Sequence, residues 1–160
     1  MNLKLIYISL LLVTGLVLMN SCDADLVISE NKAIIGGWDK DKPIDFSFEI
    51  IDTLALYDFY LNIRHSEEYA YRNIYFFVNT EFPNGNVSRD TIECMLANLR
   101  GKWYGNGYGN IKENKILIRR YLQFQNAGLY KIDFIQAMRE DELQGLSDIG
   151  IIIDKSSANY

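Results

Sequence analysis

The chain has 160 residues, of which 49% are hydrophobic, enough for one domain of ordinary size with a single core. Its 16 Lys and Arg against 21 Asp and Glu give a formal net charge of −5. Phosphate backbones repel an acidic domain, which excludes nucleic-acid binding. One histidine and two cysteines leave too few ligands for a zinc site, so no metal and no cofactor are expected.

The first 21 residues have the layout of a secretory signal peptide. Lys4 supplies a positive start, residues 5–18 form an apolar run, and Ser21 is the small residue before the cleavage point. The run is shorter than the roughly 18 residues that span a bilayer, which argues against a transmembrane helix. Cys22 stands where bacterial lipoproteins carry an acylated cysteine. We therefore expect lipidation at Cys22 and a membrane anchor, with a soluble secreted protein as the alternative.

Removal of residues 1–21 leaves 160 − 21 = 139 residues, which we divide into two parts. Residues 22–32 begin with an acidic segment and are expected to be a tether that holds the domain away from the membrane. Residues 33–160 are expected to form one domain, with a first short strand near residues 33–35.

Alternation of apolar and polar residues predicts most of the chain to be β-strand. The predicted strands cover residues 44–50, 57–64, 73–80, 87–97, 115–121, 129–135 and 148–154. Apolar residues occupy both faces of 73–80, which is typical of an interior strand. Asn84-Gly85 lies between two of the strands and predicts a hairpin turn, because both residues accept a positive φ.

Two segments depart from this pattern. Residues 98–110 carry four glycines interleaved with aromatic residues, which predicts an irregular loop rather than a helix. Residues 136–143 are expected to form one or two helical turns, with Gly145 as the C-terminal cap.

About seven or eight short strands with almost no helix indicate an antiparallel β-sandwich, jelly-roll-like in type, with a closed barrel as the alternative.

No catalytic constellation is present, and we expect no enzyme. Cys94 would need a base to act as a nucleophile, and the single histidine, His65, lies in a polar stretch, so Cys94 is interpreted as a small buried hydrophobe. Glu140-Asp141-Glu142 is a run of neighbours, whereas a glycosidase needs two carboxylates about 5 to 9.5 Å apart on either side of one bond. The acidic run is interpreted as solvated charge.

Four aromatic residues in loop-like sequence form a candidate ligand or partner surface: Trp38, Trp103, Tyr104 and Tyr108. They can pack over glycine backbone and complete the core, or they can stack on sugar rings as part of a carbohydrate site. Interaction with other envelope proteins is the preferred hypothesis, and carbohydrate binding is the second.

Several residues have a structural interpretation. Asn84 and Gly85 set the register of the hairpin. Arg139, next to Met138 and before an acidic run, is expected to form a salt bridge. Gly145 and Gly150 suit tight turns around the last strand.

Segments spread along most of the mature chain resemble, in this order, the gliding motility lipoproteins of the GldH family. They are Ser21-Cys22-Asp23, Arg64…Tyr69…Asn73-Ile74-Tyr75, Asn79-Thr80…Phe82-Pro83-Asn84-Gly85, Asp90-Thr91-Ile92-Glu93-Cys94…Leu96-Ala97, Gly101-Lys102-Trp103-Tyr104-Gly105-Asn106-Gly107…Gly109, Gly128-Leu129-Tyr130 and Gln136-Ala137-Met138-Arg139…Leu143…Gly145-Leu146…Asp148-Ile149-Gly150. One departure is Ala70, which stands where the family pattern has proline.

The resemblance implies a lipoprotein required for surface gliding, which works beside other Gld lipoproteins and the type IX secretion machinery. It implies no enzymatic activity. Because relatives also occur in bacteria that do not glide, envelope transport or surface assembly is the broader implied role. The implied location is the cell envelope, with the outer membrane favoured over the inner one and the domain in the periplasm or at the cell surface.

Overall fold

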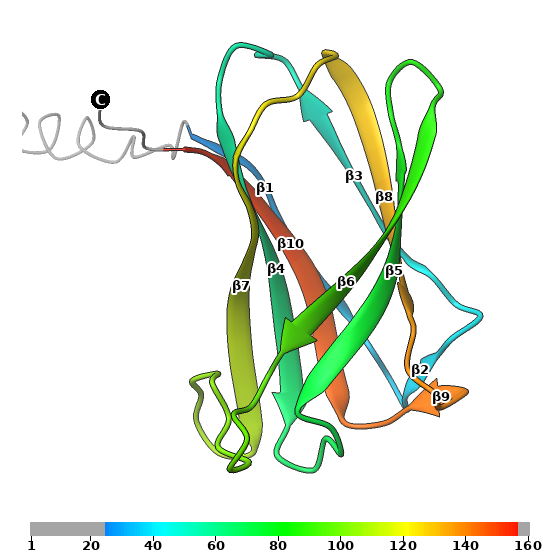
Figure 1. Ribbon diagram of the computed structural model, residues 1–160, viewed down its shortest axis with the longest axis vertical. Coiled ribbons are helices and arrows are strands. Elements are labelled where there is room, and N and C mark those ends of the chain that lie inside the picture. The colour runs from blue at the N-terminus through cyan, green and yellow to red at the C-terminus, as the bar shows by residue number, and fades with distance from the viewer. Residues whose placement is uncertain (1–24, 157–160) are drawn as a thin grey trace, which may run out of the picture.

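The computed structural model describes residues 25–156, which form a β-sandwich of two four-stranded antiparallel sheets and one two-stranded sheet (Figure 1). The predicted fold class is confirmed. Cys22 and the predicted signal peptide lie outside the described residues. Within residues 25–156, no helix has the length and apolar character needed to cross a membrane.

Ten strands follow one another along the chain. They are β1 (Leu26–Ala33), β2 (Trp38–Asp39), β3 (Ile44–Ile50), β4 (Tyr57–Ser66), β5 (Asn73–Glu81), β6 (Val87–Met95), β7 (Ile111–Leu122), β8 (Gly128–Gln136), β9 (Glu142–Leu143) and β10 (Leu146–Lys155).

The strand order in the two large sheets is that of a jelly roll. One sheet has the order β1-β10-β4-β7 and the other β3-β8-β5-β6, while β2 pairs with β9. With the two-residue strands left out, the eight long strands are ordered 1-8-3-6 and 2-7-4-5, which is the double Greek-key arrangement. β5 is an interior strand, as its two apolar faces predict.

The core lies between the two large sheets and is rich in aromatic rings. Along β3, Phe46, Phe48 and Ile50 are buried while the residues that alternate with them face solvent. The Phe46 ring meets that of Phe134 edge-on at 6.0 Å, and the Phe48 ring stacks on that of Tyr130 at 5.6 Å. Cys94 is buried on β6, as expected of a small hydrophobe.

The first strand begins earlier than the sequence predicted. Residues 26–32, expected to belong to the tether, form most of β1, which pairs with β10 from Leu26↔Asp154 to Ala33↔Asp148. β1 is an edge strand whose side chains are largely exposed or half-buried. The sequence of β1 shows no alternation of apolar and polar residues, so it did not predict this strand. The partner of β1, β10, lies at the far end of the chain.

The helical turns expected over residues 136–143 are absent. β8 continues to Gln136, and the chain then makes a turn into β9. The side chain of Gln136 stabilises this turn, because its Nε2 donates to the Glu140 carbonyl at 2.8 Å and its Oε1 accepts from the Met138 N–H at 2.9 Å. Gly145 is therefore no helix cap. It has φ +85° between β9 and β10, where a Cβ would lie 2.8 Å from Tyr69 Cα.

Gly150 and the hairpin turn also differ from their predictions in detail. Gly150 lies within β10 rather than in a turn, and the Asn31 side chain occupies the space of its missing Cβ. The hairpin turn joins β5 to β6 as expected, but only Gly85 has a positive φ, of +81°. Asn84 instead uses its Oδ1 to accept the Asn86 N–H at 3.0 Å.

Candidate functional site

Trp38, one of the four aromatic residues expected on a binding surface, belongs to the core. It is 3% exposed, and its ring lies 5.7 Å from that of Phe76. Its indole N–H donates to the Lys42 carbonyl at 2.9 Å. The pairing of β2 with β9 covers this residue, a long-range contact that its glycine-flanked sequence did not reveal. Trp38 therefore has no free ring face to offer a ligand.

Trp103 packs the base of the loop over residues 98–110. Its ring lies 4.4 Å from the imidazole of His65, and the residue forms an isolated β-bridge with Ala97. The N–H of Tyr104 donates to the Leu96 carbonyl at 2.8 Å, which ties the loop to the end of β6. Of the four aromatic residues, only Tyr104 and Tyr108 are exposed. The structure thus does not bring the four together into one surface.

His65 is fully buried and is not positioned as a catalytic base. Its Nδ1 lies 2.8 Å from the Ser66 carbonyl oxygen, and its ring contacts those of Tyr69 and Trp103. Within residues 25–156, its Nε2 has no hydrogen-bond partner. Burial lowers the pKa of His65, so the ring is neutral at pH 7.

The thiol of Cys94 is likewise unsuited to act as a nucleophile. Burial raises its pKa to about 12, so no thiolate forms at neutral pH. Within the described residues, no group of three or more His, Cys, Asp or Glu could hold a metal ion.

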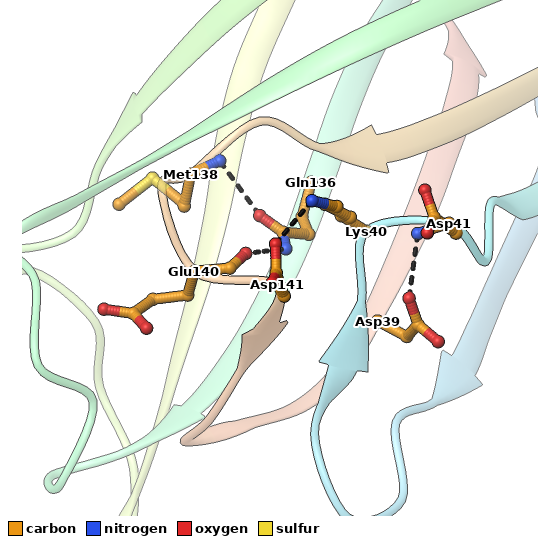
Figure 2. A network of polar contacts seen from close by, with 7 residues as sticks. All are labelled: Asp39, Lys40, Asp41, Gln136, Met138, Glu140 and Asp141. Carbon is orange, nitrogen blue, oxygen red and sulfur yellow. Dashed lines mark hydrogen bonds and ion pairs between the residues drawn. The ribbon is translucent and has the colours of Figure 1, made fainter.

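Two side chains of the acidic run at residues 140–142 stabilise a turn, and Figure 2 shows one of them, Asp141, beside Lys40. Asp141 forms an ion pair with Lys40, whose backbone N–H also donates to the Asp141 carbonyl at 2.9 Å. Glu140 accepts the hydroxyl proton of Tyr71 at 2.6 Å. Glu140 and Asp141 face different partners on the surface. Asp141 holds the β8–β9 connection against the segment that follows β2, and Glu140 holds it against the β4–β5 connection.

Met138 and Arg139 lie in the turn after β8, and Arg139 does not form the salt bridge expected of it with any described residue. Met138 packs partly buried against the core, and its Sδ lies 3.4 Å from the backbone N–H of Tyr75. Arg139 is exposed and forms no ion pair with any residue from 25 to 156. The next two carboxylates in the chain have other partners: Glu140 accepts from Tyr71 and Asp141 pairs with Lys40.

A cleft of about 630 Å³ lies between the two sheets. It lies between the edge strands β6 and β7, together with the β5–β6 hairpin and the β7–β8 connection. On the opposite side of the sandwich, β1 and β3 pack against each other. The floor is apolar and aromatic and comprises Phe48, Phe59, Phe82, Ile92, Ile118, Leu122, Phe124 and Tyr130.

The rim of the cleft offers hydrogen-bonding groups that the protein itself does not use. Within residues 25–156, eight polar side chains of the lining have no hydrogen bond or ion pair: Thr80, Asn86, Ser88, Asp90, Thr91, Arg119, Gln125 and Asn126. One carboxylate and one guanidinium leave the rim without a strong net charge. An apolar floor with a few free polar groups is typical of a binding site. The lining therefore offers apolar contacts and hydrogen-bonding groups.

Sequence reasoning missed this cleft. Two amide-rich turns, residues 84–86 and 123–126, were a visible signal. The two turns meet because β6 and β7 are the edge strands on the same side of the two facing sheets. This arrangement follows from the strand order.

A family profile and two relatives match this chain along almost the whole of the described domain. A family profile described as GldH lipoprotein matches residues 26–153. A gliding motility lipoprotein GldH homolog of Christiangramia forsetii is 35% identical over 148 residues, which cover 88% of this chain and 91% of that protein. The gliding motility lipoprotein GldH of Flavobacterium johnsoniae is 32% identical over 152 residues, which cover 91% of this chain and 94% of the relative.

Solved structures resemble this one only distantly. The uncharacterised protein lmo2446 of Listeria monocytogenes has a TM-score of 0.41 at 15% identity, covering 81% of this chain and 11% of its own. A carbohydrate-binding module specific for non-crystalline cellulose, CBM28, also has a TM-score of 0.41, at 11% identity, covering 81% of this chain and 72% of its own. Likeness at this level carries no information about what this chain binds.

Proposed function

Because the chain belongs to the GldH lipoprotein family, we propose that it is a non-enzymatic lipoprotein of the cell envelope that works in gliding motility. In this proposal Cys22 carries the lipid, and the anchor lies in the outer membrane rather than the inner one. The partners are other envelope proteins of the gliding and type IX secretion machinery.

The observation that carries the proposal is the match to gliding motility lipoproteins at 32% and 35% identity across about nine-tenths of the chain. The geometry supports a binding role rather than a chemical one. His65 and Cys94 are both enclosed in the core, and the acidic run at residues 140–142 stabilises a turn.

The cleft between β6 and β7 is the proposed partner site. Both flanking strands are sheet edges, and apart from the bridge between Glu113 of β7 and Asn106 their outer backbone groups are free of sheet pairing within the described chain. Ser88 faces the cleft from β6, and its hydroxyl has no partner among residues 25–156. An arginine at this position would place a long charged side chain over the apolar floor and block entry.

The test is to express Ser88→Arg in a gliding bacterium that lacks its own copy of this family. We expect loss of colony spreading and loss of co-purification with the other Gld lipoproteins, while the amount of protein in the membrane stays normal. Ser47→Arg is the matched control, because Ser47 is an exposed serine on β3, the edge strand of the same sheet away from the cleft. Wild-type spreading and co-purification in Ser88→Arg would rule out the cleft as the partner site.

A glycan-binding surface lipoprotein is the second candidate function. The unpartnered amide and hydroxyl groups of the cleft rim support it, whereas the buried Trp38 and the packed Trp103 do not. Binding of the purified domain to an oligosaccharide array, abolished by Ser88→Arg and retained by Ser47→Arg, would favour this candidate. If the wild-type domain binds no oligosaccharide on the array and Ser88→Arg still abolishes motility, a protein partner is favoured.

A further inference from the structure

The chain between the proposed lipid and the folded domain is very short. Asp25 is already fixed, because its carbonyl oxygen accepts the N–H of Lys155 at 2.7 Å. Only 25 − 22 = 3 residue steps separate it from Cys22, and a chain of three residues spans at most about 11 Å. The end of the sandwich at which β1 begins must therefore lie close to the membrane that holds the lipid.

We call this part of the molecule the anchor end. It comprises the start of β1, the end of β10, the β3–β4 loop (residues 51–56), the start of β4 and the end of β7, at the top of Figure 1. Hydrogen bonds join these segments: the N–H of Ser156 donates to the Leu56 carbonyl at 2.8 Å, and the N–H of Tyr121 donates to Asp58 Oδ1 at 3.0 Å.

The β3–β4 loop holds two large apolar side chains out in solvent. Ile51 is 84% exposed and Leu54 is 87% exposed. The loop is a bonded turn, because Asp52 Oδ1 accepts the N–H of Leu54 at 3.0 Å and that of Ala55 at 3.2 Å. The hydroxyl of Tyr57 also donates to the Asp52 carbonyl, at 2.7 Å. The turn thus presents Ile51 and Leu54 in a fixed direction.

The charges around this loop are largely compensated. Lys155 Nζ lies 3.2 Å from Asp52 Oδ2, and Arg120 Nε lies 4.0 Å from Asp58 Oδ2. Asp58 also accepts the hydroxyl proton of Ser156. Although the protein as a whole is acidic, these two carboxylates carry little uncompensated charge that would keep the loop away from lipid headgroups.

We propose that the anchor end is a membrane-contacting surface, in which Ile51 and Leu54 enter the boundary between headgroups and acyl chains. Exposed apolar side chains next to a lipid anchor bury in this boundary, and tyrosines favour the headgroup level, where the half-exposed Tyr121 would lie. The contact sets the orientation of the domain on the membrane. The proposal rests on acylation of Cys22, which is part of the proposed function.

An environment-sensitive fluorophore on position 54 tests the contact. Cys94 is buried with a pKa near 12 and Cys22 is acylated, so a Leu54→Cys variant of the full-length lipoprotein can be labelled at one site. The labelled protein is reconstituted into vesicles of phosphatidylethanolamine and phosphatidylglycerol. We expect a blue-shifted emission and several-fold stronger quenching by brominated lipid acyl chains than at the control position.

The matched control is Ile35→Cys. Ile35 is 92% exposed and follows the opposite end of β1, so its label is expected to report water. Equal, water-like signals at positions 54 and 35 on protein that floats with the vesicles would overturn the proposal, as would stronger quenching at position 35. Protein that fails to float at all would instead refute acylation of Cys22, which separates the two failures.

Discussion

At the scale of single residues, His65 is the side chain whose burial has the clearest energetic consequence. Its ring lies between those of Trp103 and Tyr69, and burial lowers its pKa. The sequence around His65 did not predict its burial, because its neighbours in the chain are polar and the rings that enclose it come from two separate loops. The prediction that Trp38 lies on a binding surface is wrong for the same reason, because the residues that bury it are distant in the chain.

The stability of the domain is expected to fall as the pH decreases through about 6.5, the ordinary pKa of histidine in an unfolded chain. The folded pKa lies below that value, so the unfolded state binds the extra proton first and the free energy of unfolding declines with decreasing pH. Thermal melts between pH 7.5 and 5.5 measure this decline. Since His65 is the only histidine, His65→Asn should flatten the profile. Parallel profiles for the two proteins would contradict the buried, neutral imidazole.

At the scale of elements, the strands were the most predictable part of the fold. Alternation along β3, β4, β5 and β8 was visible in the sequence because each has one face in the core. β1 was missed because an edge strand with exposed side chains lacks that alternation. The segment after β8 was misread as helical, because a single buried glutamine, Gln136, supplies hydrogen bonds that local propensity cannot anticipate.

The β5–β6 hairpin provides a test of one turn residue. Gly85 has φ +81°, and a Cβ there would meet no atom within 4 Å, so a larger residue is penalised only through the backbone. Gly85→Val should cost about 1–2 kcal/mol of unfolding free energy, because a β-branched residue must adopt left-handed geometry. Gly85→Asn should cost much less, since asparagine tolerates that region. Denaturant titrations of the three proteins measure the difference, and equal midpoints would disprove the turn geometry.

At the scale of the whole molecule, the number of alternating segments indicated a sandwich but not which strands meet. The order of the sheets places the β5–β6 hairpin and the β7–β8 connection, with the cleft that they line, beside the anchor end at the top of Figure 1. This meeting of two turns distant in sequence depends on the jelly-roll order, and no single stretch of sequence carries it. The domain boundary was likewise misplaced, because β1 pairs with the last strand of the chain.

Truncation tests the corrected boundary. A protein that begins at Ala33 lacks β1 and leaves the backbone edge of β10 uncovered, which invites edge-to-edge association. We expect it to be aggregated or unfolded, as judged by size-exclusion chromatography and circular dichroism. A protein that begins at Asp25 keeps β1 and should remain monodisperse and folded. A monodisperse, folded protein from Ala33 would show that β1 is dispensable.

The pairing of β1 with β10 also determines how the domain responds to mechanical force. The strands are antiparallel, and seven residue pairs join them along the length of β1. A load that enters through Cys22 and leaves at the opposite end of the sandwich pulls β1 along its own axis. The interstrand hydrogen bonds lie perpendicular to that axis and are sheared together. A load applied between the two ends of the described chain, Asp25 and Ser156, would instead open the pairs one after another. The domain is therefore built to resist traction from the proposed lipid anchor better than traction between the two ends of the described chain.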